Sequence, residues 1–250
     1  MKLKENLRNS LDYVSKLFKD GGRAAILILL NIIPIVNFIV TGYFGRVIKE
    51  SPESDAPPPL EKYGALWVEG LKIVIVSFVY MIVPIILLLI GFASISIGFA
   101  FFPFIGLGVI GGVLIAVGLV LSFLIAIVAI MGIIRMVKTD RMGEAFNLGE
   151  ILSKTRSIGW VNYIVWLVVI FLISLVASWL PSQIPIIGWA IALIVAAPLI
   201  VFIGRSASIL YESGISVEKP PYRIFCGYCG NPLSPEDKFC GNCGKPVSQT

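Results

Sequence analysis

The apolar run from residue 71 to residue 137 constrains the fold of this chain more than any other feature. Its only charges are Lys72 and Arg135, which lie near its two ends. About 20 helical residues cross the ~30 Å hydrocarbon core of a bilayer, at ~1.5 Å per residue. The run is long enough for two long helices or three short ones, and glycines and a proline between residues 91 and 108 mark a break near its middle.

The composition of the chain supports the same class. Of its 250 residues 57% are hydrophobic and 14% are charged, against ~25% charged in ordinary soluble domains. The mean hydropathy is +0.93, and no soluble domain can bury that much apolar surface. Further apolar runs cover residues 24–45, 157–180 and 186–211. We therefore predict an all-α polytopic membrane protein with four to six membrane segments.

Residues 1–23 are predicted to form a basic amphipathic helix in the membrane interface. Six Lys and Arg side chains alternate with one apolar stripe at three- and four-residue spacing, a pattern that favours the headgroup region. The stripe consists of Leu3, Leu7, Leu11, Val14 and Phe18.

The first apolar run, residues 24–45, is interrupted by Asn31, Pro34 and Asn37. Proline removes a backbone donor and clashes with the preceding turn, and amide side chains in hydrocarbon need partners. The run is therefore predicted to be a broken or re-entrant segment. The asparagines either bind a ligand or satisfy the backbone beside the proline, and we favour the second.

The distribution of Lys and Arg predicts the topology. Residues 46–70 carry three and residues 138–156 carry four, whereas the turns at 92–106 and 181–185 carry none. The positive-inside rule places the basic segments and both termini in the cytoplasm of a cell-membrane protein. This arrangement has one re-entrant segment and four spans. The alternative has six spans, with the long run folded three times, and it too places the C-terminus inside.

Two nearly identical segments hold all the cysteines: Phe-Cys-Gly-Tyr-Cys-Gly at 225–230 and Phe-Cys-Gly-Asn-Cys-Gly at 239–244. Each Cys-x2-Cys pair places two sulfurs on one tight turn, and the glycines allow backbone conformations that a side chain would block. Two such turns facing each other form a tetrahedral site with ligands Cys226, Cys229, Cys240 and Cys243.

We predict that this site holds a structural zinc ion. Four protein ligands leave no open position for a catalytic water. Two disulfides or reduced thiols are the alternatives, and disulfides are rare in the reducing cytoplasm. Iron is a further alternative, but the gap between the pairs is short for a rubredoxin-like fold.

Residues 224–247 closely resemble the zinc-ribbon family. The resemblance rests on the repeated Cys-x2-Cys-Gly turns, on Pro232 and Pro246 after them, and on Phe239 before the second pair. It implies a small zinc-folded unit that contacts proteins or nucleic acids. Because a unit this small buries little core, the metal must supply most of its folding energy. The segment between the turns has no basic cluster, which argues against nucleic acid.

The predicted domains are therefore a membrane domain at 24–213, a linker at 214–224 and the zinc ribbon at 225–247, after the interfacial helix. Arg205 is the one charge inside a predicted span, and snorkelling of its side chain to the interface is the simplest interpretation. Small residues spaced by four, Gly108, Gly112 and Ala116, could let two helices approach closely.

Catalytic signals are absent from the sequence. The chain has no histidine, which removes the commonest general base, and it has neither a nucleophile elbow nor a phosphate-binding loop. No Asp or Glu lies in 70–139 or 157–211, where an ion-coupled transporter would need them. We predict that the protein is not an enzyme.

Residues 1–213 resemble an uncharacterised family of prokaryotic, often archaeal, multi-spanning membrane proteins of unknown function. The resemblance implies an architecture and no activity. It rests on Gly42-Tyr43-x2-Arg46, the proline-rich stretch ending at Pro59, Trp67-x2-Gly70, Tyr80 with Pro84, Glu144-Ala145-Phe146 and Pro185-x2-Gly188.

The leading functional hypothesis is a non-enzymatic scaffold in the lipid bilayer whose cytoplasmic ribbon docks a protein partner. The alternative is a transporter or channel for a neutral or lipid-like solute, with the ribbon as a regulatory module, because interrupted helices often line such sites. The sequence also leaves a homo-oligomer open.

Overall fold

The computed structural model divides the chain into two compact units, residues 1–214 and residues 215–250. The structure describes residues 3–19, 21–100, 105–214, 224–225, 229, 232–233 and 242–245. In its described part the first unit contains helices joined by turns and loops and no strand, and the second contains one short pair of strands.

The first helix, α1 (Leu3–Lys19), packs against α8 (Gly188–Ser213) through a face that includes polar residues. Asn6 and Ser10 are buried on this face, and Asn6 Nδ2 donates to the carbonyl of Ser206 at 3.0 Å. Two residues of the predicted apolar stripe, Leu11 and Phe18, are exposed on another face. The amphipathic helix thus exists, and its buried side combines stripe residues such as Val14 with polar residues that bond to α8.

The predicted break in the first apolar run is confirmed. Helix α2 (Gly21–Leu30) ends before Asn31, and α3 (Asn37–Glu50) begins after a turn that contains Pro34. Asn37 Nδ2 donates to Asn31 Oδ1 at 2.7 Å, so the two side chains join the two sides of the break. Neither helix is among the four that are long and apolar enough to span a membrane.

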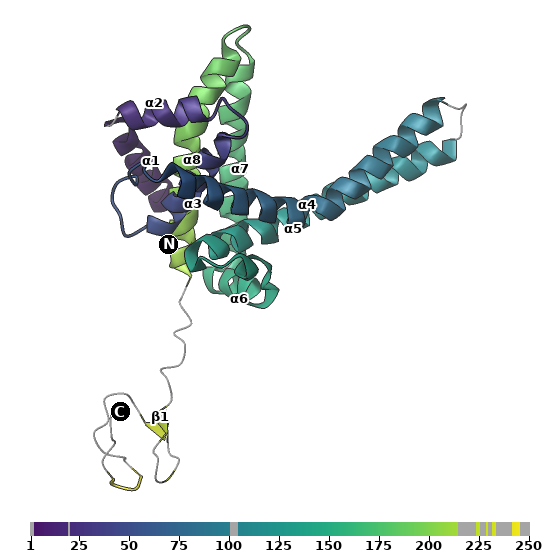
Figure 1. Ribbon diagram of the computed structural model, residues 1–250. Helices are drawn as coiled ribbons and strands as arrows, with labels where there is room; N and C mark the ends of the chain where they lie inside the picture. Colours follow the sequence, from purple (N-terminus) through teal and green to yellow (C-terminus); the bar gives the residue numbers. More distant parts are fainter. Residues whose placement is uncertain are drawn as a thin grey trace. The chain divides into compact units, whose positions relative to one another are not determined.

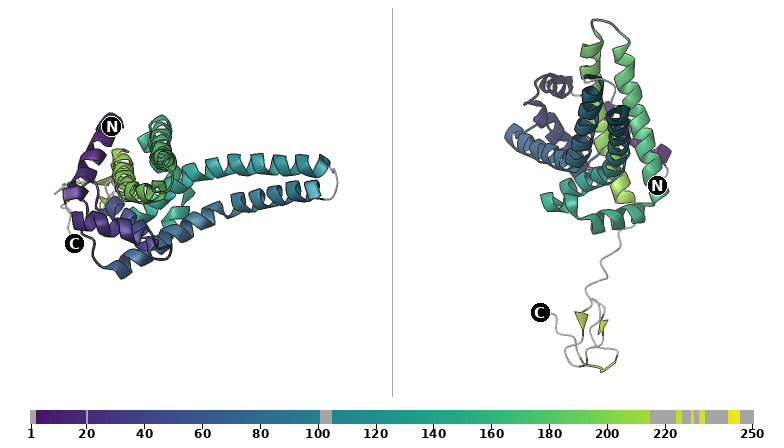
Figure 2. Two further views of the ribbon diagram at one scale, coloured as in Figure 1. Left: turned by 90° about the horizontal axis from the view of Figure 1, so that it is seen from above. Right: turned by 90° about the vertical axis from the view of Figure 1, so that its right-hand side faces the viewer.

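The long apolar run forms two helices and not three. These are α4 (Tyr63–Ala100) and α5 (Ile105–Thr139), which run side by side as one hairpin (Figures 1 and 2). The third helix that the six-span alternative required is absent from the described part of the run. The close approach of α4 and α5 lies at Gly91 and Gly111, where an added Cβ would come within 2.9 Å and 2.6 Å of the other glycine's carbonyl oxygen.

The predicted contact through Gly108 and Gly112 is wrong within this chain, because an added Cβ at either position meets nothing within 4 Å. Spacing by four shows which glycines share a helix face. It does not show which face contacts a neighbouring helix. In this chain the face of α5 that contacts α4 carries Gly111.

The remaining helices complete the helical unit. The basic segment 138–156 contains a 3-10 turn, η1 (Met142–Phe146), and most of the following helix α6 (Leu148–Ile158). Asn147 caps α6 by accepting from the Glu150 amide at 3.4 Å. Helix α7 (Trp160–Ser182) and α8 form a second hairpin. Trp160, Trp179 and Trp189 lie at the ends of these helices and are exposed, as interfacial tryptophans are.

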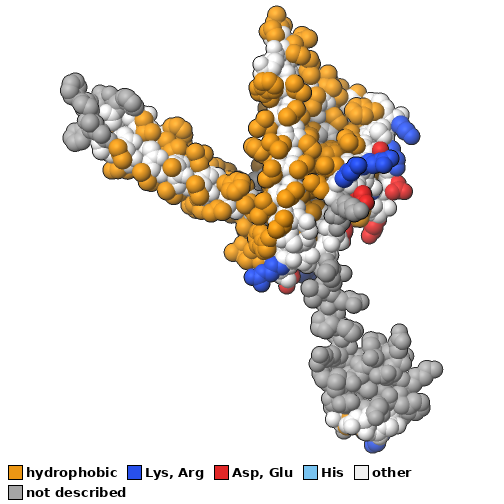
Figure 3. Space-filling model, turned by 180° about the vertical axis from the view of Figure 1, so that it is seen from behind, with side chains coloured by type: hydrophobic (Ala, Val, Ile, Leu, Met, Phe, Trp, Pro, Cys, Tyr) orange, Lys and Arg blue, Asp and Glu red, His pale blue; other side chains and the backbone are white. Residues whose placement is uncertain are grey.

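Four helices of the described chain are therefore candidate spans: Tyr63–Gly98, Gly106–Thr139, Trp160–Ser182 and Gly188–Ser213. Hydrophobic side chains cover both hairpins, and charged side chains gather away from their tips (Figure 3). The protein is an all-α polytopic membrane protein, and the polar ends of its spans meet around the loop that joins α3 to α4.

Two glycines bring α3 and α4 into contact. An added Cβ at Gly42 would lie 1.8 Å from the Leu66 carbonyl oxygen, and one at Gly70 would lie 1.8 Å from that of Phe38. Both obstacles are backbone atoms, so any side chain would push the two helices apart.

We predict that Gly70→Ala destabilises the helical unit. Overpacking costs about 1–3 kcal/mol, which corresponds to a fall of roughly 2–12 °C in the melting temperature. Gly64→Ala on the same helix is the matched control, because a Cβ there meets nothing within 4 Å. Thermal unfolding in detergent measures both variants, and equal melting temperatures would contradict this account of the contact.

Candidate functional site

The cysteine module begins with two short antiparallel strands. Strand β1 (Ile224–Phe225) pairs with β2 (Pro232–Leu233), and Ile224 lies opposite Leu233. Cys229 lies between these two strands, in a turn.

Cys229 and Cys243 are exposed in turns. Gly244, directly after Cys243, has a φ of 72°, the left-handed conformation expected of a glycine in such a turn. Cys226 and Cys240 lie outside the described residues, so the four predicted ligands are not seen together. Among the described residues no three potential metal ligands lie together. The left-handed glycine suits a tight Cys-x2-Cys turn, and four thiolates would be a closed ligand set for Zn²⁺.

A second polar centre lies in the loop from Ser51 to Lys62, between α3 and α4. Its prolines carry no N–H, so its carbonyl groups are available to side chains from surrounding helices. The carbonyl of Ser51 accepts from Lys138 Nζ of α5 and from Ser208 Oγ of α8. We call the carbonyl groups of residues 51–61 that accept such bonds the carbonyl hub.

Arg205 is the most deeply buried cation of the hub, with 3% of its surface exposed. Its Nη1 donates to the Ser54 carbonyl at 2.7 Å, and its Nε donates to Asn9 Oδ1 at 2.9 Å. The guanidinium also lies over the ring of Tyr13, 4.6 Å from its centroid. The predicted snorkelling of Arg205 is therefore wrong, because α1 and the loop cover the side chain and supply its partners.

Other helices reach the hub through cationic and phenolic side chains. Arg23 of α2 donates to the carbonyls of Pro57 and Pro58 at 2.7 and 3.2 Å. Tyr43 of α3 donates to Pro58 at 2.9 Å. Burial raises the pKa of the Tyr43 hydroxyl, which keeps it protonated as a donor. Arg46 donates to the Glu61 carbonyl at 2.9 Å.

A neighbouring cluster fixes η1 against the spans. Arg135 Nη2 lies 2.8 Å from Glu144 Oε2 and 3.4 Å from Glu150 Oε2. Tyr80 of α4 donates to the Ala145 carbonyl, and its ring lies 5.3 Å from that of Phe146. These contacts connect α4, α5 and η1.

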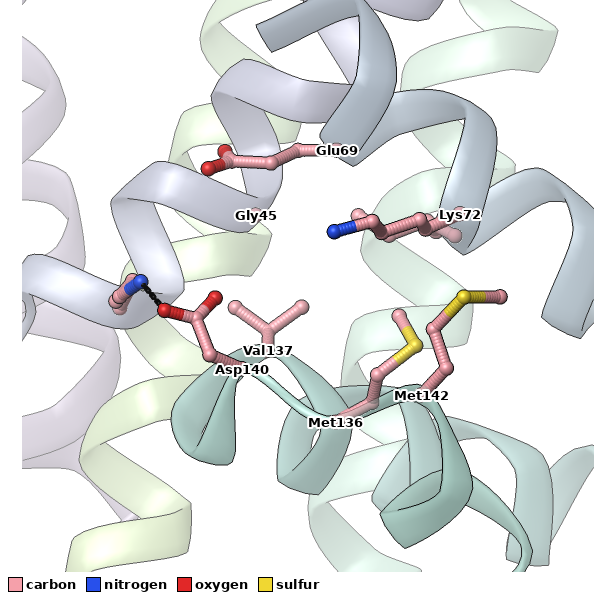
Figure 4. A pocket seen from close by; sticks show the side chains of 9 residues that line it. Gly45, Glu69, Lys72, Met136, Val137, Asp140 and Met142 are labelled. Carbon is pink, nitrogen blue, oxygen red and sulfur yellow. Dashed lines mark hydrogen bonds and ion pairs between the residues drawn. The ribbon is translucent and has the colours of Figure 1, made fainter. Parts of the chain in front are cut away.

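The charged residues beside α3 enclose a pocket too small for a substrate. Lys49 pairs with Asp140, and Glu69 and Lys72 complete the charged rim (Figure 4). The pocket has a volume of about 30 Å³, which holds about one water molecule, whereas small-molecule sites measure ~300–1,000 Å³.

A protein-family model described as a protein of unknown function (DUF4013) matches residues 25–210. The chain belongs to this family. A zinc-ribbon domain model matches residues 225–247, which implies zinc binding by the tail of this DUF4013 protein. No curated protein and no solved structure matches the chain. The prokaryotic, often archaeal, source implied by the resemblance is not part of these matches and stays a prediction.

The motifs that carried the resemblance have structural roles in this DUF4013 chain. Tyr43 and Arg46 bind the proline-rich stretch. Trp67 Nε1 donates to the Ile35 carbonyl at 3.0 Å, which holds the break between α2 and α3. Gly188 lies so close to Pro181 that an added Cβ would be 2.2 Å from its carbonyl oxygen.

Sequence reasoning missed the hub and the role of Arg205. The available signal was a polar face on α1, where Asn6, Ser10 and Tyr13 recur at helical spacing, together with one arginine in an apolar span. Matching these two features would have suggested that α1 covers Arg205.

We predict that Arg205→Met weakens the helical unit by about 1.5–3 kcal/mol, the contribution of hydrogen bonds to a charged group. It leaves the Ser54 carbonyl and Asn9 without their donor. Arg141→Met, at an exposed position, is the matched control. Thermal unfolding and protease cleavage within α1 are the measurements; unfolding at the same temperature in both variants would contradict the role assigned to Arg205.

We predict one zinc ion per chain, measured by elemental analysis of the purified protein. A chelator should remove it and expose residues 215–250 to protease, while the melting temperature of the helical unit stays unchanged. Acid should also release the metal, because its ligands must be thiolates. Cys229→Ser and Cys243→Ser should lose the zinc, and Asn242→Ser, between the cysteines, should keep it. Full zinc occupancy in both cysteine variants would contradict the ligand assignment.

Proposed function

We propose that the chain is a non-enzymatic scaffold of the cell membrane whose zinc ribbon docks a protein partner in the cytoplasm. The observation that carries the proposal is the separation of two units. A helical unit contains the candidate spans, and a distinct unit of residues 215–250 matches the zinc-ribbon family, for which we propose a closed set of four thiolates. Such a set gives a small unit its fold and leaves no coordination position for chemistry.

The polar clusters of the helical unit support a structural role. Arg205, Lys138 and Tyr43 each donate to a loop carbonyl, and Arg135 is paired with two glutamates. Asn31 and Asn37 bond to each other. A catalytic group needs a reacting atom within reach of a cavity, and the charged pocket at Lys72 has room for about a water molecule.

The proposed orientation rests on charge. The polar ends of α5, α6 and α8 lie together, because Lys138 is 3.0 Å from Glu212 and Lys154 lies 4.5 Å from the ring centroid of Tyr211. These ends hold the basic segments, whereas the turns at the opposite ends of the two hairpins carry no Lys or Arg. The positive-inside rule then assigns the basic ends, both termini and the ribbon to the cytoplasm.

The charges of the ribbon suit a protein partner better than a nucleic acid. The segment from Ser234 to Lys238 contributes one lysine and two acidic residues, which gives no basic stripe for a phosphate backbone. The transport alternative keeps one supporting observation, an apolar cavity of about 490 Å³ among the spans, which would suit a lipid-like solute. Flux of such a solute through vesicles containing the full chain would favour it over the scaffold.

Zinc-dependent capture of a partner tests the proposal. Full-length protein is crosslinked in native membranes and purified, and its partners are identified by mass spectrometry. We expect a reproducible partner that is lost with Cys226→Ser and with Cys240→Ser, because both variants unfold the ribbon, and that is retained with Asn242→Ser. Partners that survive both cysteine changes would rule out docking through the ribbon.

A further inference from the structure

The two helical hairpins enclose an apolar wedge. A cavity of about 490 Å³ and one of about 420 Å³ adjoin each other and share Ile130, Leu167 and Phe171. The smaller cavity is lined by side chains of α5 and α7 alone. Figure 3 shows hydrophobic side chains on both arms where the hairpins diverge. We call these two cavities the wedge.

The wedge is closed at its base by hydrogen bonds. Tyr163 of α7 donates its hydroxyl to the Ile127 carbonyl of α5 at 2.5 Å. Trp166, one turn further along α7, donates to Ser206 Oγ of α8 at 2.8 Å. Tyr163 and Trp166 are both buried. The Tyr163 bond fixes the point from which α5 and α7 separate, and the Trp166 bond holds α7 against α8.

The helix lengths explain why the wedge does not close. Helix α4 has 38 residues and α5 has 35, which corresponds to more than ~50 Å at ~1.5 Å per residue. Helix α7 has 23 residues, or about 35 Å. Helices longer than the ~30 Å hydrocarbon core tilt to fit it, so the α4–α5 hairpin tilts more than the α7–α8 hairpin and the space between them lies in hydrocarbon.

The hydroxyl groups that line the wedge already have hydrogen-bond partners in their own helices. Ser77 Oγ donates to the Ile73 carbonyl and Ser174 Oγ to the Ile170 carbonyl, both at 2.8 Å. Thr41 Oγ1 lies 3.4 Å from the Asn37 carbonyl. Each of these hydroxyls bonds within its own helix, so the wall offers hydrocarbon contacts and no unpaired donor to a polar solute.

The size of the wedge selects between apolar occupants. One turn of a second copy's helix, ~10 Å wide and ~5.4 Å tall, occupies roughly 400 Å³, so either cavity holds little more than one turn. A flexible hydrocarbon chain can follow both cavities past Ile130 and Leu167. We propose that the wedge is a binding site for one acyl chain of a membrane phospholipid.

Photolabelling of the purified full-length protein in detergent tests the site. The probe is a trace of phosphatidylglycerol that carries a diazirine in one acyl chain, and labelled residues are mapped by mass spectrometry. We expect labelling at Ile130 and Leu167, which are partly buried, that saturates and is displaced by unlabelled phospholipid. Labelling of exposed residues such as Phe92 should not saturate, because detergent and lipid exchange freely there.

Two variants fill the wedge from opposite walls, Ser77→Leu on α4 and Ser174→Phe on α7. Each should lower the saturable labelling several-fold while the melting temperature stays near that of the parent. Ser96→Leu and Ser96→Phe are the controls, because Ser96 also bonds its own helix, at 2.9 Å, but is exposed; they should not change the labelling. Non-saturable labelling throughout, unchanged labelling in both filled variants, or crosslinks from wedge residues to a second copy would each overturn the proposal.

Discussion

The helical unit depends on hydrogen bonds from cationic and hydroxyl side chains to the carbonyl hub. In a low-dielectric setting a buried polar group without a partner is costly, and the hub satisfies donors and acceptors together. Ser51 joins α5 to α8, Ser54 binds Arg205 of α8, and Pro58 binds Tyr43 of α3 and Arg23 of α2. Proline-rich sequence suits this task, because it has few N–H groups of its own and its fixed φ reduces the entropy lost on ordering.

This organisation gives many polar residues of the helical unit a structural partner. Lys138 and Arg205, in the cytoplasmic halves of their spans under the proposed orientation, bind loop carbonyls, so in that orientation the same residues serve topology and folding. Beyond the hub, the hairpins pack through glycine contacts such as that of Gly91 with Gly111 and present hydrocarbon to their surroundings. Residues 215–250, which include the match to the zinc-ribbon family, form a separate compact unit, as the proposed docking role requires.

Features with a local cause could be predicted from the sequence. The lengths of the apolar runs predicted the long helices, and Pro34 predicted the break between α2 and α3. The Cys-x2-Cys spacing predicted the zinc ribbon that the family model matches. Features that depend on partners distant in sequence could not. Arg205 looked like a snorkelling side chain because Asn9, about two hundred residues earlier, is its partner. The wedge depends on the angle between two hairpins, which hydropathy does not encode.

Hydrogen–deuterium exchange of a loop-replacement variant tests the hub most directly. Residues 52–59 are replaced by a Gly/Ser sequence of equal length, and residues 216–223 are replaced in the same way as the control. We predict that amides of α1 and of the last turns of α5 and α8 exchange faster together in the first variant and are unchanged in the control. Faster exchange confined to the replaced loop itself, with α1 and α8 protected as in the parent, would contradict the account.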